Sequence, residues 1–396
     1  MKKNFSVGRI IYVIALCMII IPACDLRKDY SNILYYLGIV LLLFKALISF
    51  IPNMRFKLKR NQVRVVGIWI LLLLTLLPGF AVNNYGLEVI IENAFTFILY
   101  FILLANSDME IEDIIIASVI SNLYFAYRCF FEIGIVQALY QGIATNPNQM
   151  SLVLVGGIIA SLYLIVNCRL IGKIAGFFSL AISLILVFFT SCRSVMLISV
   201  AAIVLYLLYY FKEVKNADIF SNRKIEKKTF IIWLCLVCGC IIVVFTLWDN
   251  IIAFLFEKWG YGVTTVLSGR NDLWNIIINN ISFTGKNSSE INANNDYFDW
   301  LMKYGILSFI VYIYLLFFCV RVIWGNYKVN KQDNIWEIII IILYLAICFV
   351  ENIHATFGKS INIMFWFTLG TIMRTSINKN QNKYQIGTNE CSDDAE

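Results

Sequence analysis

Long apolar stretches recur from one end of this chain to the other, and they limit what it can fold into. The chain has 396 residues, of which 60% are hydrophobic and only 14% are charged. A soluble domain is nearer one quarter charged. Apolar stretches of about 20 residues are long enough to cross a bilayer as α-helices. We therefore expect an all-α, polytopic membrane protein.

The apolar stretches predict about twelve membrane spans in a single transmembrane domain, residues 1–375. Lysine and arginine mark cytoplasmic loops, and the strongest such mark is the basic run NMRFKLKRNQVR after the second span. Alternation from this loop places both termini in the cytoplasm, including a polar, disordered tail at 376–396. The loop NSDMEIED is acidic although it is expected inside, but carboxylates count little in this rule. For eight of the predicted spans both boundaries can be given, and they are about residues 10–24, 32–51, 65–81, 88–105, 112–132, 171–190, 230–248 and 297–320.

Residues 249–296 form the one long polar stretch between spans, and we expect them outside the cytoplasm, just before the tenth span. A structureless loop of this length is uncommon unless it is functional or disordered. This loop keeps several aromatic residues, among them Trp274, whereas disordered segments are poor in aromatics. We therefore expect this loop to carry the catalytic site.

Arg193 and Arg270 lie in segments predicted to face outward, where the positive-inside rule disfavours arginine. Arg193 stands in the tight turn TSCRS, and Arg270 stands in GRNDLW, near the start of a predicted short helix, NDLWNIIINNI. Each could simply snorkel to lipid headgroups. The alternative is an anion site, because guanidinium groups bind phosphate oxygens bidentately and helix N-termini favour anions. An outward-facing phosphate site at a membrane indicates a lipid-linked phosphate.

The segment NANNDYFDWLMKYG stands at the entry to the tenth span and combines amides, carboxylates and aromatic rings. Such groups suit the faces and hydroxyls of sugars. An interfacial aromatic belt would explain the rings, but it does not explain the run of Asn and Asp. The candidate substrate-binding residues here are Asn294, Asn295 and Tyr297, with Trp274 from the outer loop, and Asp296 is a candidate catalytic carboxylate.

The segment ENIHATFGKS follows the eleventh span on the predicted outer side and holds Glu351, His354 and Lys359. His354 is the only histidine of the chain. A lone histidine is usually incidental, but one near a carboxylate can transfer protons. Glu351 and His354 are therefore candidate catalytic residues, and Lys359 is a candidate substrate-binding residue. In TNPNQM, before the sixth span, we interpret the Asn and Gln residues as turn and capping residues.

Other chemistries have little support in the sequence. The net charge of +7 comes from short loops on one side of the membrane, so it does not indicate nucleic-acid binding. Cys235, Cys238 and Cys240 imitate a metal-binding pattern, but no histidine or carboxylate accompanies them in their apolar segment. The chain also has no nucleotide-binding glycine loop. We expect no metal site and no cofactor.

Four of these segments, TNPNQM, TSCRS, GRNDLW and NNDYFDWLMKYGILSFI, occur in an order and with a sidedness that resemble the bacterial O-antigen polymerase and O-antigen ligase superfamily. The superfamily also contains capsular and exopolysaccharide repeat-unit polymerases, and the resemblance covers most of the chain from about residue 140 on. It implies metal-independent glycosyl transfer at the outer face of the bacterial cytoplasmic membrane, from a glycan carried on undecaprenyl pyrophosphate. In the superfamily, outer-face arginines hold the pyrophosphate, and Arg193 and Arg270 match their positions.

The resemblance has one departure, because the superfamily often has His-Asn where this chain has Asn294-Asn295. That histidine is associated with acceptor activation in the ligases. Its absence favours a repeat-unit polymerase, and it leaves Asp296, Glu351 and His354 as alternatives for accepting the hydroxyl proton. A ligase is the closest rival function, and a flippase for lipid-linked oligosaccharides is a rival of another class. Besides the lipid-linked oligosaccharide and membrane lipid, the implied partners are a chain-length regulator and a flippase.

Overall fold

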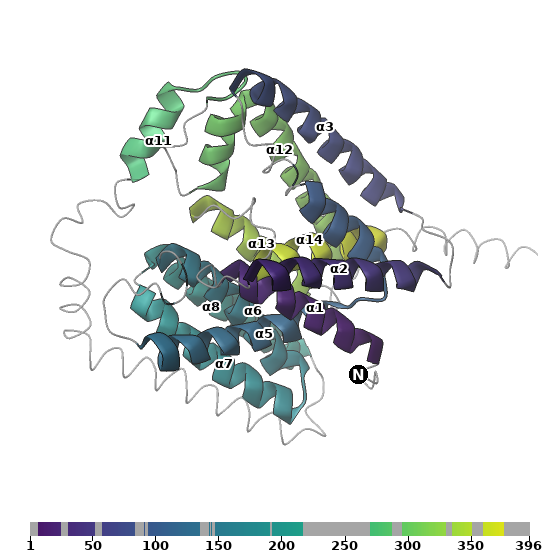
Figure 1. The fold of residues 1–396 in the computed structure, drawn as a ribbon, viewed down its shortest axis with the longest axis vertical. Helices are drawn as coiled ribbons and strands as arrows, with labels where there is room; N and C mark the ends of the chain where they lie inside the picture. The colour runs from purple at the N-terminus through teal and green to yellow at the C-terminus, as the bar shows by residue number, and fades with distance from the viewer. Residues whose placement is uncertain are drawn as a thin grey trace, which may run out of the picture. The chain divides into compact units, whose positions relative to one another are not determined.

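The computed structural model of the chain is drawn in Figure 1. All regular elements in the described part of the chain are helices, so the expected all-α class is confirmed there. The described residues are 7–24, 31–51, 58–83, 91, 94–134, 142, 144, 147–190, 192–216, 270–286, 295–329, 335–350 and 359–375. Their elements are α1 (Val7–Cys24), α2 (Ser31–Phe50), α3 (Arg60–Asn83), the π-helix η2 (Phe97–Leu103), the 3-10 turn η3 (Leu104–Asn106), α5 (Ile111–Tyr127), the π-helix η4 (Arg128–Ile133), α6 (Pro147–Asn167), α7 (Leu170–Thr190), α8 (Arg193–Asn216), α11 (Arg270–Asn279), α12 (Asp296–Val329), α13 (Ile335–Val350) and α14 (Ser360–Thr375).

The chain divides into two compact units. One unit comprises Met1–Ala202 and Asp272–Glu396, and the other comprises Ile203–Asn271. Most of the second unit lies outside the described residues, including the predicted ninth span at 230–248 and most of the loop at 249–296. The tail at 376–396 lies outside them as well. The single transmembrane domain, the tail and the large loop therefore stay predictions.

Six described helices are long and apolar enough to cross a membrane. They cover Ile33–Phe50, Arg60–Gly79, Ile111–Ile133, Met150–Asn167, Leu170–Thr190 and Tyr297–Gly325. Four shorter apolar helices cover Gly8–Ala23, Ala94–Asn106, Val195–Leu207 and Trp336–Phe349. A multi-pass membrane protein is the class that this set of helices fits. Every predicted span with described residues falls on a helix, and the count of twelve stays a prediction.

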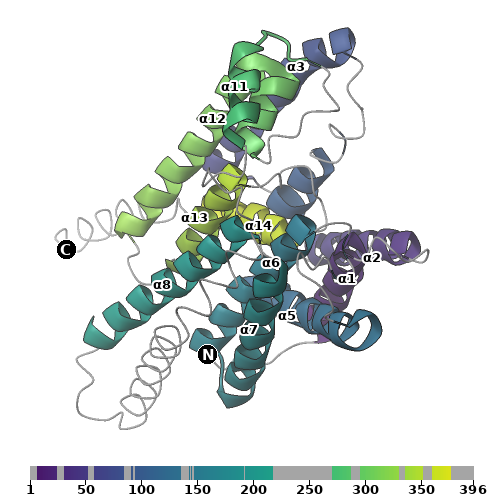
Figure 2. The ribbon, with the colours of Figure 1, turned by 90° about the vertical axis from the view of Figure 1, so that its left-hand side faces the viewer.

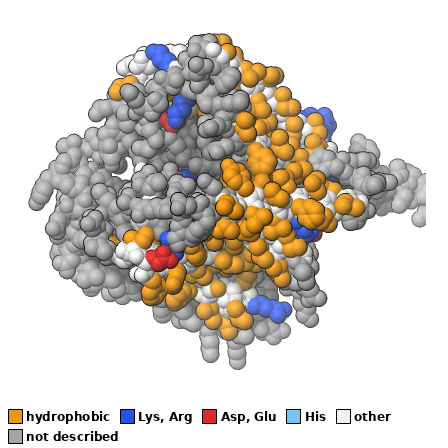
Figure 3. Space-filling view, viewed as in Figure 1, with side chains coloured by type: hydrophobic (Ala, Val, Ile, Leu, Met, Phe, Trp, Pro, Cys, Tyr) orange, Lys and Arg blue, Asp and Glu red, His pale blue; other side chains and the backbone are white. Residues whose placement is uncertain are grey.

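Hydrophobic side chains cover the outer surface of α2 and α3 (Figure 3). On α2, for example, Tyr36 and Val40 are 65% and 61% exposed, and on α3 Leu71 and Leu74 are 49% and 55% exposed. Apolar surface of this extent is the kind that lipid covers in a membrane-spanning helix. The opposite face of α3 is buried at Trp69, so this helix has one face toward the protein and one away from it.

Small and polar residues, rather than large apolar side chains, form the contacts described here between helices α5, α6 and α7. The amide nitrogen of Asn122 on α5 donates to the hydroxyl oxygens of Ser179 and Ser183 on α7, over 2.9 and 2.6 Å. Ser161 on α6 donates to Ser179 over 2.8 Å. Gly157 on α6 lies directly against Asn122, which leaves no room for a side chain. Close backbone approach with interhelical hydrogen bonds is how membrane helices associate, and α6 and α7 lie side by side in both ribbon views (Figures 1 and 2).

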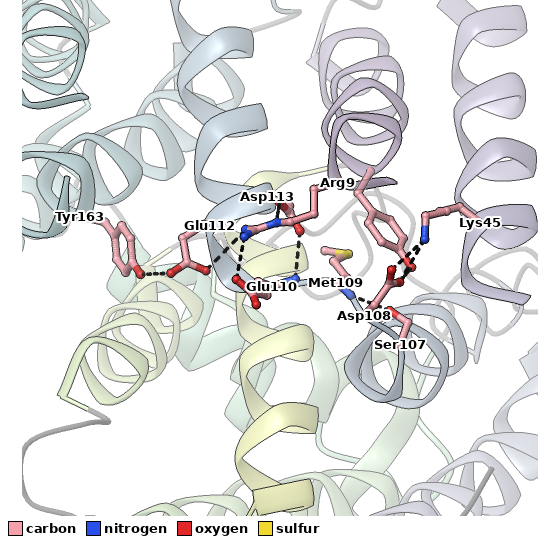
Figure 4. A network of polar contacts seen from close by, with 10 residues as sticks. Arg9, Lys45, Ser107, Asp108, Met109, Glu110, Glu112, Asp113 and Tyr163 are labelled. Carbon is pink, nitrogen blue, oxygen red and sulfur yellow. Dashed lines mark hydrogen bonds and ion pairs between the residues drawn. The ribbon is translucent and has the colours of Figure 1, made fainter. Parts of the chain in front are cut away.

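The acidic loop NSDMEIED is partly neutralised by basic residues from α1 and α2 (Figure 4). Arg9 pairs with Glu110 and Asp113, each over 2.8 Å, and Lys45 pairs with Asp108 over 2.9 Å. Burial by itself would raise the pKa of Asp108, but hydrogen bonds from Lys45 and Tyr12 outweigh it and lower that pKa below its ordinary value. The contacts join residues predicted to share one side of the membrane.

Helix α12 departs from the prediction of a simple span at 297–320. Its backbone leaves the helical conformation at Gly305, with φ 81° and ψ 173°, a combination that essentially only glycine adopts. The rings of Trp300 and Tyr312 stack with centroids 4.6 Å apart, whereas twelve residues of continuous helix rise about 18 Å. The first part of α12 therefore folds back against the second. The apolar helix at Tyr297–Gly325, which begins where the tenth span was predicted to begin, is broken at Gly305.

A short segment, residues 282–286, which we call the strap, forms hydrogen bonds with the backbone on both sides of Gly305. The backbone nitrogen of Lys286 donates to the carbonyl oxygen of Met302 over 2.9 Å, and that of Ile306 donates to Ser282 over 3.1 Å. These bonds satisfy groups that a broken helix would otherwise leave without partners. Gly285 and Gly305 are both at positive φ where the strap crosses the corner, and neither has space for a Cβ. The strap thereby fixes the short first part of α12 in place.

Candidate functional site at the junction of α11, α12 and α13

Asn295 closes the start of α12 and joins it to the end of α13. Its side-chain oxygen accepts from the backbone nitrogens of Tyr297 and Phe298 over 2.9 and 3.1 Å, which is the standard role of an N-cap residue. Its amide nitrogen donates to the carbonyl oxygen of Phe349 over 2.7 Å. That carbonyl belongs to the last turn of α13, where helix carbonyls have no partner in the helix. Asn295 is fully buried.

Aromatic rings from three helices complete the junction. Trp274 of α11 stacks on Phe298 of α12 with centroids 5.0 Å apart, and it meets Phe349 of α13 edge-on at 6.1 Å. The hydroxyl of Tyr297 donates to the carbonyl oxygen of Leu345 over 3.2 Å. A buried contact between Ile277 and Met302 continues the packing of α11 against α12. The three helix ends are thus fixed relative to one another by both polar and ring contacts.

The junction brings together elements that the sequence places far apart. Asn295 and Leu345 are separated by 50 positions in the chain, yet Tyr297 contacts both through its backbone and side chain. Helix α13 ends at Val350, and Glu351 and His354 follow it directly in the chain. The polar segment at the start of α12 and the end of α13 are therefore joined at the same junction.

Three of the ten predicted site residues, Trp274, Asn295 and Tyr297, meet in the junction. Lys359 is buried just before α14, and its carbonyl oxygen accepts from Asn362 and Ile363. Arg193, Arg270 and Asp296 are the first residues of α8, α11 and α12, and their side chains lie outside the described part of the structure. Asn294, Glu351 and His354 lie outside the described residues altogether.

The predicted short helix after the GRN motif is confirmed as α11, which begins at Arg270. The predicted tight turn before Arg193 is confirmed too, since only Ser191 and Cys192 separate α7 from α8. Helix α6, which holds the predicted sixth span, begins at Pro147, a residue that suits the first turn of a helix.

The ion pair between Asp299 and Lys303 was not predicted from the sequence, although Asp299 belongs to the polar and aromatic segment NANNDYFDWLMKYG. The carboxylate of Asp299 is buried and pairs with Lys303 over 2.9 Å, one turn along the first part of α12. Their spacing of four residues was the available signal. This spacing was given no weight because the helix was expected to run straight into the membrane, without the fold-back at Gly305. The substrate contact predicted for Asn295 stays a prediction. The structure shows in addition that its side chain caps α12.

No group of three or more metal-ligating side chains occurs among the residues that the structure describes. A scan against protein-family models finds none that matches this chain, and a search of curated proteins finds no match either. The resemblance to the O-antigen polymerase and ligase superfamily accordingly rests on the four motifs quoted above.

Proposed function

We propose that this protein polymerises lipid-linked oligosaccharide repeat units of a surface polysaccharide at the outer face of the bacterial cytoplasmic membrane. The observation that carries the proposal is the junction of α11, α12 and α13. It joins α11, which begins with Arg270, the polar and aromatic start of α12 at Asn295, and the last turn of α13. In the proposal, Arg270 supplies a cation for the leaving pyrophosphate, and the start of α12 supplies a surface for the sugars.

In the proposed reaction, a hydroxyl oxygen of the acceptor sugar attacks the anomeric carbon of the donor glycan. The bond from that carbon to the pyrophosphate oxygen breaks, and undecaprenyl pyrophosphate leaves with the bonding electrons. Arg270 and Arg193 stabilise the negative charge that grows on the leaving pyrophosphate. The hydroxyl proton passes to Asp296, Glu351 or His354. The reaction consumes no metal ion and no redox cofactor.

Tyr297 and Trp274 are the proposed platform for the sugars. Both are partly exposed, Trp274 stacks on Phe298, and Tyr297 lies against Phe349. Fixed platforms hold two large substrates in register, and such positioning lowers the barrier because the entropy is lost on binding. Asn295 helps to position Tyr297, because its side-chain oxygen caps the first turn of α12.

A ligase, which moves a finished glycan to another acceptor, is the closest rival because it uses the same donor. The Asn294-Asn295 pair in place of His-Asn favours the polymerase. A flippase is less well supported, since ion-coupled transporters carry ionisable groups at mid-membrane. The described carboxylate pairs stand near helix ends instead, as Arg9 with Asp113 and Lys303 with Asp299 do.

The glycan of a deletion strain tests the proposal and separates the rivals. We expect single repeat units in place of polymer, with polymer restored by the wild-type gene. Polymer that accumulates on the lipid carrier would instead indicate a ligase. Repeat units trapped on the cytoplasmic side would indicate a flippase. An unchanged surface polysaccharide would contradict all three functions.

A further inference from the structure

One flank of α11 is apolar, although this helix belongs to the predicted outer loop at 249–296. Ile277 packs against Met302 and so marks the side of α11 that faces α12 (Figures 1 and 2). Successive residues of an α-helix are about 100° apart, so Ile278 lies beside this buried side while Asn275 and Asn279 lie opposite it. These three side chains are exposed, Ile278 by 50%. Helix α11 therefore has a polar outer side and an apolar flank.

The opposite flank of α11 leads into polar contacts. Ile276 lies on this flank, and its carbonyl oxygen accepts from the side-chain amide of Asn280 over 2.8 Å. The side-chain oxygen of Asn280 accepts in turn from the ammonium group of Lys286 over 3.0 Å. Lys286 is exposed, and a lysine keeps its charged end in water or among lipid headgroups. The two flanks of α11 therefore suit different environments.

Exposed apolar residues continue after Ile278 into the strap. Ile281 is 40% exposed, and Phe283 is 66% exposed. Between them in the chain, the carbonyl oxygen of Ser282 accepts from the backbone nitrogen of Ile306 over 3.1 Å. This bond places the exposed residues of the strap at the start of the second part of α12.

The second part of α12 carries an exposed apolar stripe that begins at the same point. Its members recur at intervals of four, three and four residues, and they are Ile306, Ile310, Ile313 and Phe317. Such intervals keep side chains on one face of a helix. Because α12 is long and apolar enough to cross a membrane, lipid is the environment that suits this face. The exposed residues of the strap therefore adjoin a surface that lipid covers.

We propose that α11 and the strap form an interfacial anchor in the outer leaflet of the membrane. Ile278, Ile281 and Phe283 insert between the lipids, while the side with Asn275 and Asn279 faces water. Phospholipid is the occupant that continuity favours, because the strap is bonded directly to the residue at which the lipid-facing stripe of α12 begins. A helix of this kind lies in the plane of the interface and does not cross the bilayer. The inference goes beyond the proposed function, which requires no contact between this helix and lipid.

Spin-label accessibility of the full-length protein in phospholipid nanodiscs tests the anchor. Ile278→Cys and Asn279→Cys each receive one nitroxide, in a background without the native cysteines, and Ile310→Cys is the reference for a lipid-facing position. Relaxation of the label by oxygen, which concentrates in lipid, is compared with relaxation by a nickel chelate, which stays in water. We expect the ratio of oxygen to nickel accessibility to be several-fold higher at 278 than at 279, and to approach the ratio at 310.

Three results would overturn the anchor. Equally low ratios at 278 and 279 would place both sides of α11 in water. Protection of the label at 278 from both reagents, with dipolar broadening between labels, would show that a second copy of the chain covers this flank. The same protection without broadening would show that another segment of the same chain covers it.

Photocrosslinking in cells gives a second measurement that keeps the native cysteines. A benzophenone amino acid replaces Ile278 in one variant and Asn279 in the other, and covalent adducts are identified by mass spectrometry. We expect phospholipid adducts at 278 and several-fold fewer at 279. Adducts with protein at 278, or equal lipid adducts at both positions, would refute the anchor even if the cysteine-free protein did not fold.

Neither measurement requires polymer to form. Lipid contact at 278 in a protein whose deletion leaves the surface polysaccharide unchanged would refute the polymerase and keep the anchor. Loss of polymer on deletion, without lipid contact at 278, would refute the anchor alone.

Discussion

Replacing Gly305 with alanine should destabilise this protein, because the fold-back of α12 depends on a backbone conformation that alanine rarely adopts. The φ angle of Gly305 is 81°, and a residue with a side chain in such a region costs about 1–3 kcal/mol. A Cβ at this position would also lie 2.5 Å from the backbone nitrogen of Gly285. Backbone atoms cannot rotate out of the way, so the corner has to open.

Opening the corner breaks the two backbone hydrogen bonds of the strap, from Lys286 to Met302 and from Ile306 to Ser282. Each contributes about 0.5–1.5 kcal/mol. Together with the backbone term, we expect Gly305→Ala to lower the free energy of unfolding by about 2–6 kcal/mol. Gly325→Ala is the matched control in the same helix. A Cβ at Gly325 meets nothing within 4 Å, and alanine in a helix interior is more favourable than glycine by up to about 1 kcal/mol.

The assay is thermal unfolding of each purified variant in the same detergent, compared with the wild type. The two substitutions should act in opposite directions, with Gly305→Ala less stable and Gly325→Ala as stable or more so. Spin labels at positions 297 and 312 give an independent distance, since fifteen residues of continuous helix would separate them by about 22 Å. Stabilisation by Gly305→Ala, or a label distance near that value in the wild type, would show that α12 is continuous and refute the reasoning.

Three further predictions concern single side chains. Arg270→Ala should reduce polymer formed in the deletion strain on the order of hundreds-fold, and Arg270→Lys should remain impaired because lysine lacks the planar fork; full activity of the lysine variant would remove the pyrophosphate role. Arg9→Gln should cost about 3–5 kcal/mol in thermal unfolding, because it leaves the buried carboxylate of Asp113 without its charge partner, and adding Asp113→Asn should recover part of that loss. Asn295→Ala should lose both the cap of α12 and the bond to Phe349, so it should lower the free energy of unfolding by about 1–2 kcal/mol and form less polymer; an unchanged unfolding temperature would argue against the cap.

The helices were predictable because a bilayer imposes their length and apolar composition on the sequence. Helix α6 illustrates this, since Met150–Asn167 is almost uniformly apolar and begins three residues after a proline that suits a first turn. The short helix α11 was predictable for another reason. Its apolar residues recur at helical spacing in the sequence NDLWNIIINNI.

The ion pairs of the acidic loop could not be predicted, because the partners are remote in the chain. Arg9 and Asp113 stand 104 positions apart, and hydropathy contains no information on which span packs beside which. The same is true of Asn295 and Phe349. The cap itself had a signal, since an asparagine directly before DYFD is a common helix start. Asn295 was instead predicted to contact the substrate because it stands in a run of polar residues.

The fold-back of α12 explains why the candidate site stands at a helix junction rather than only in the long loop. A continuous span from Tyr297 would carry Tyr312 about 22 Å away along its axis, and the ring contacts of Tyr312 with Tyr297 and Trp300 could not form. The break at Gly305 brings the rings of these two residues within 6.2 Å, measured between centroids. The backbone hydrogen bonds of the strap stabilise the broken helix. One glycine in an apolar run therefore determines where the polar and aromatic start of α12 lies relative to α13.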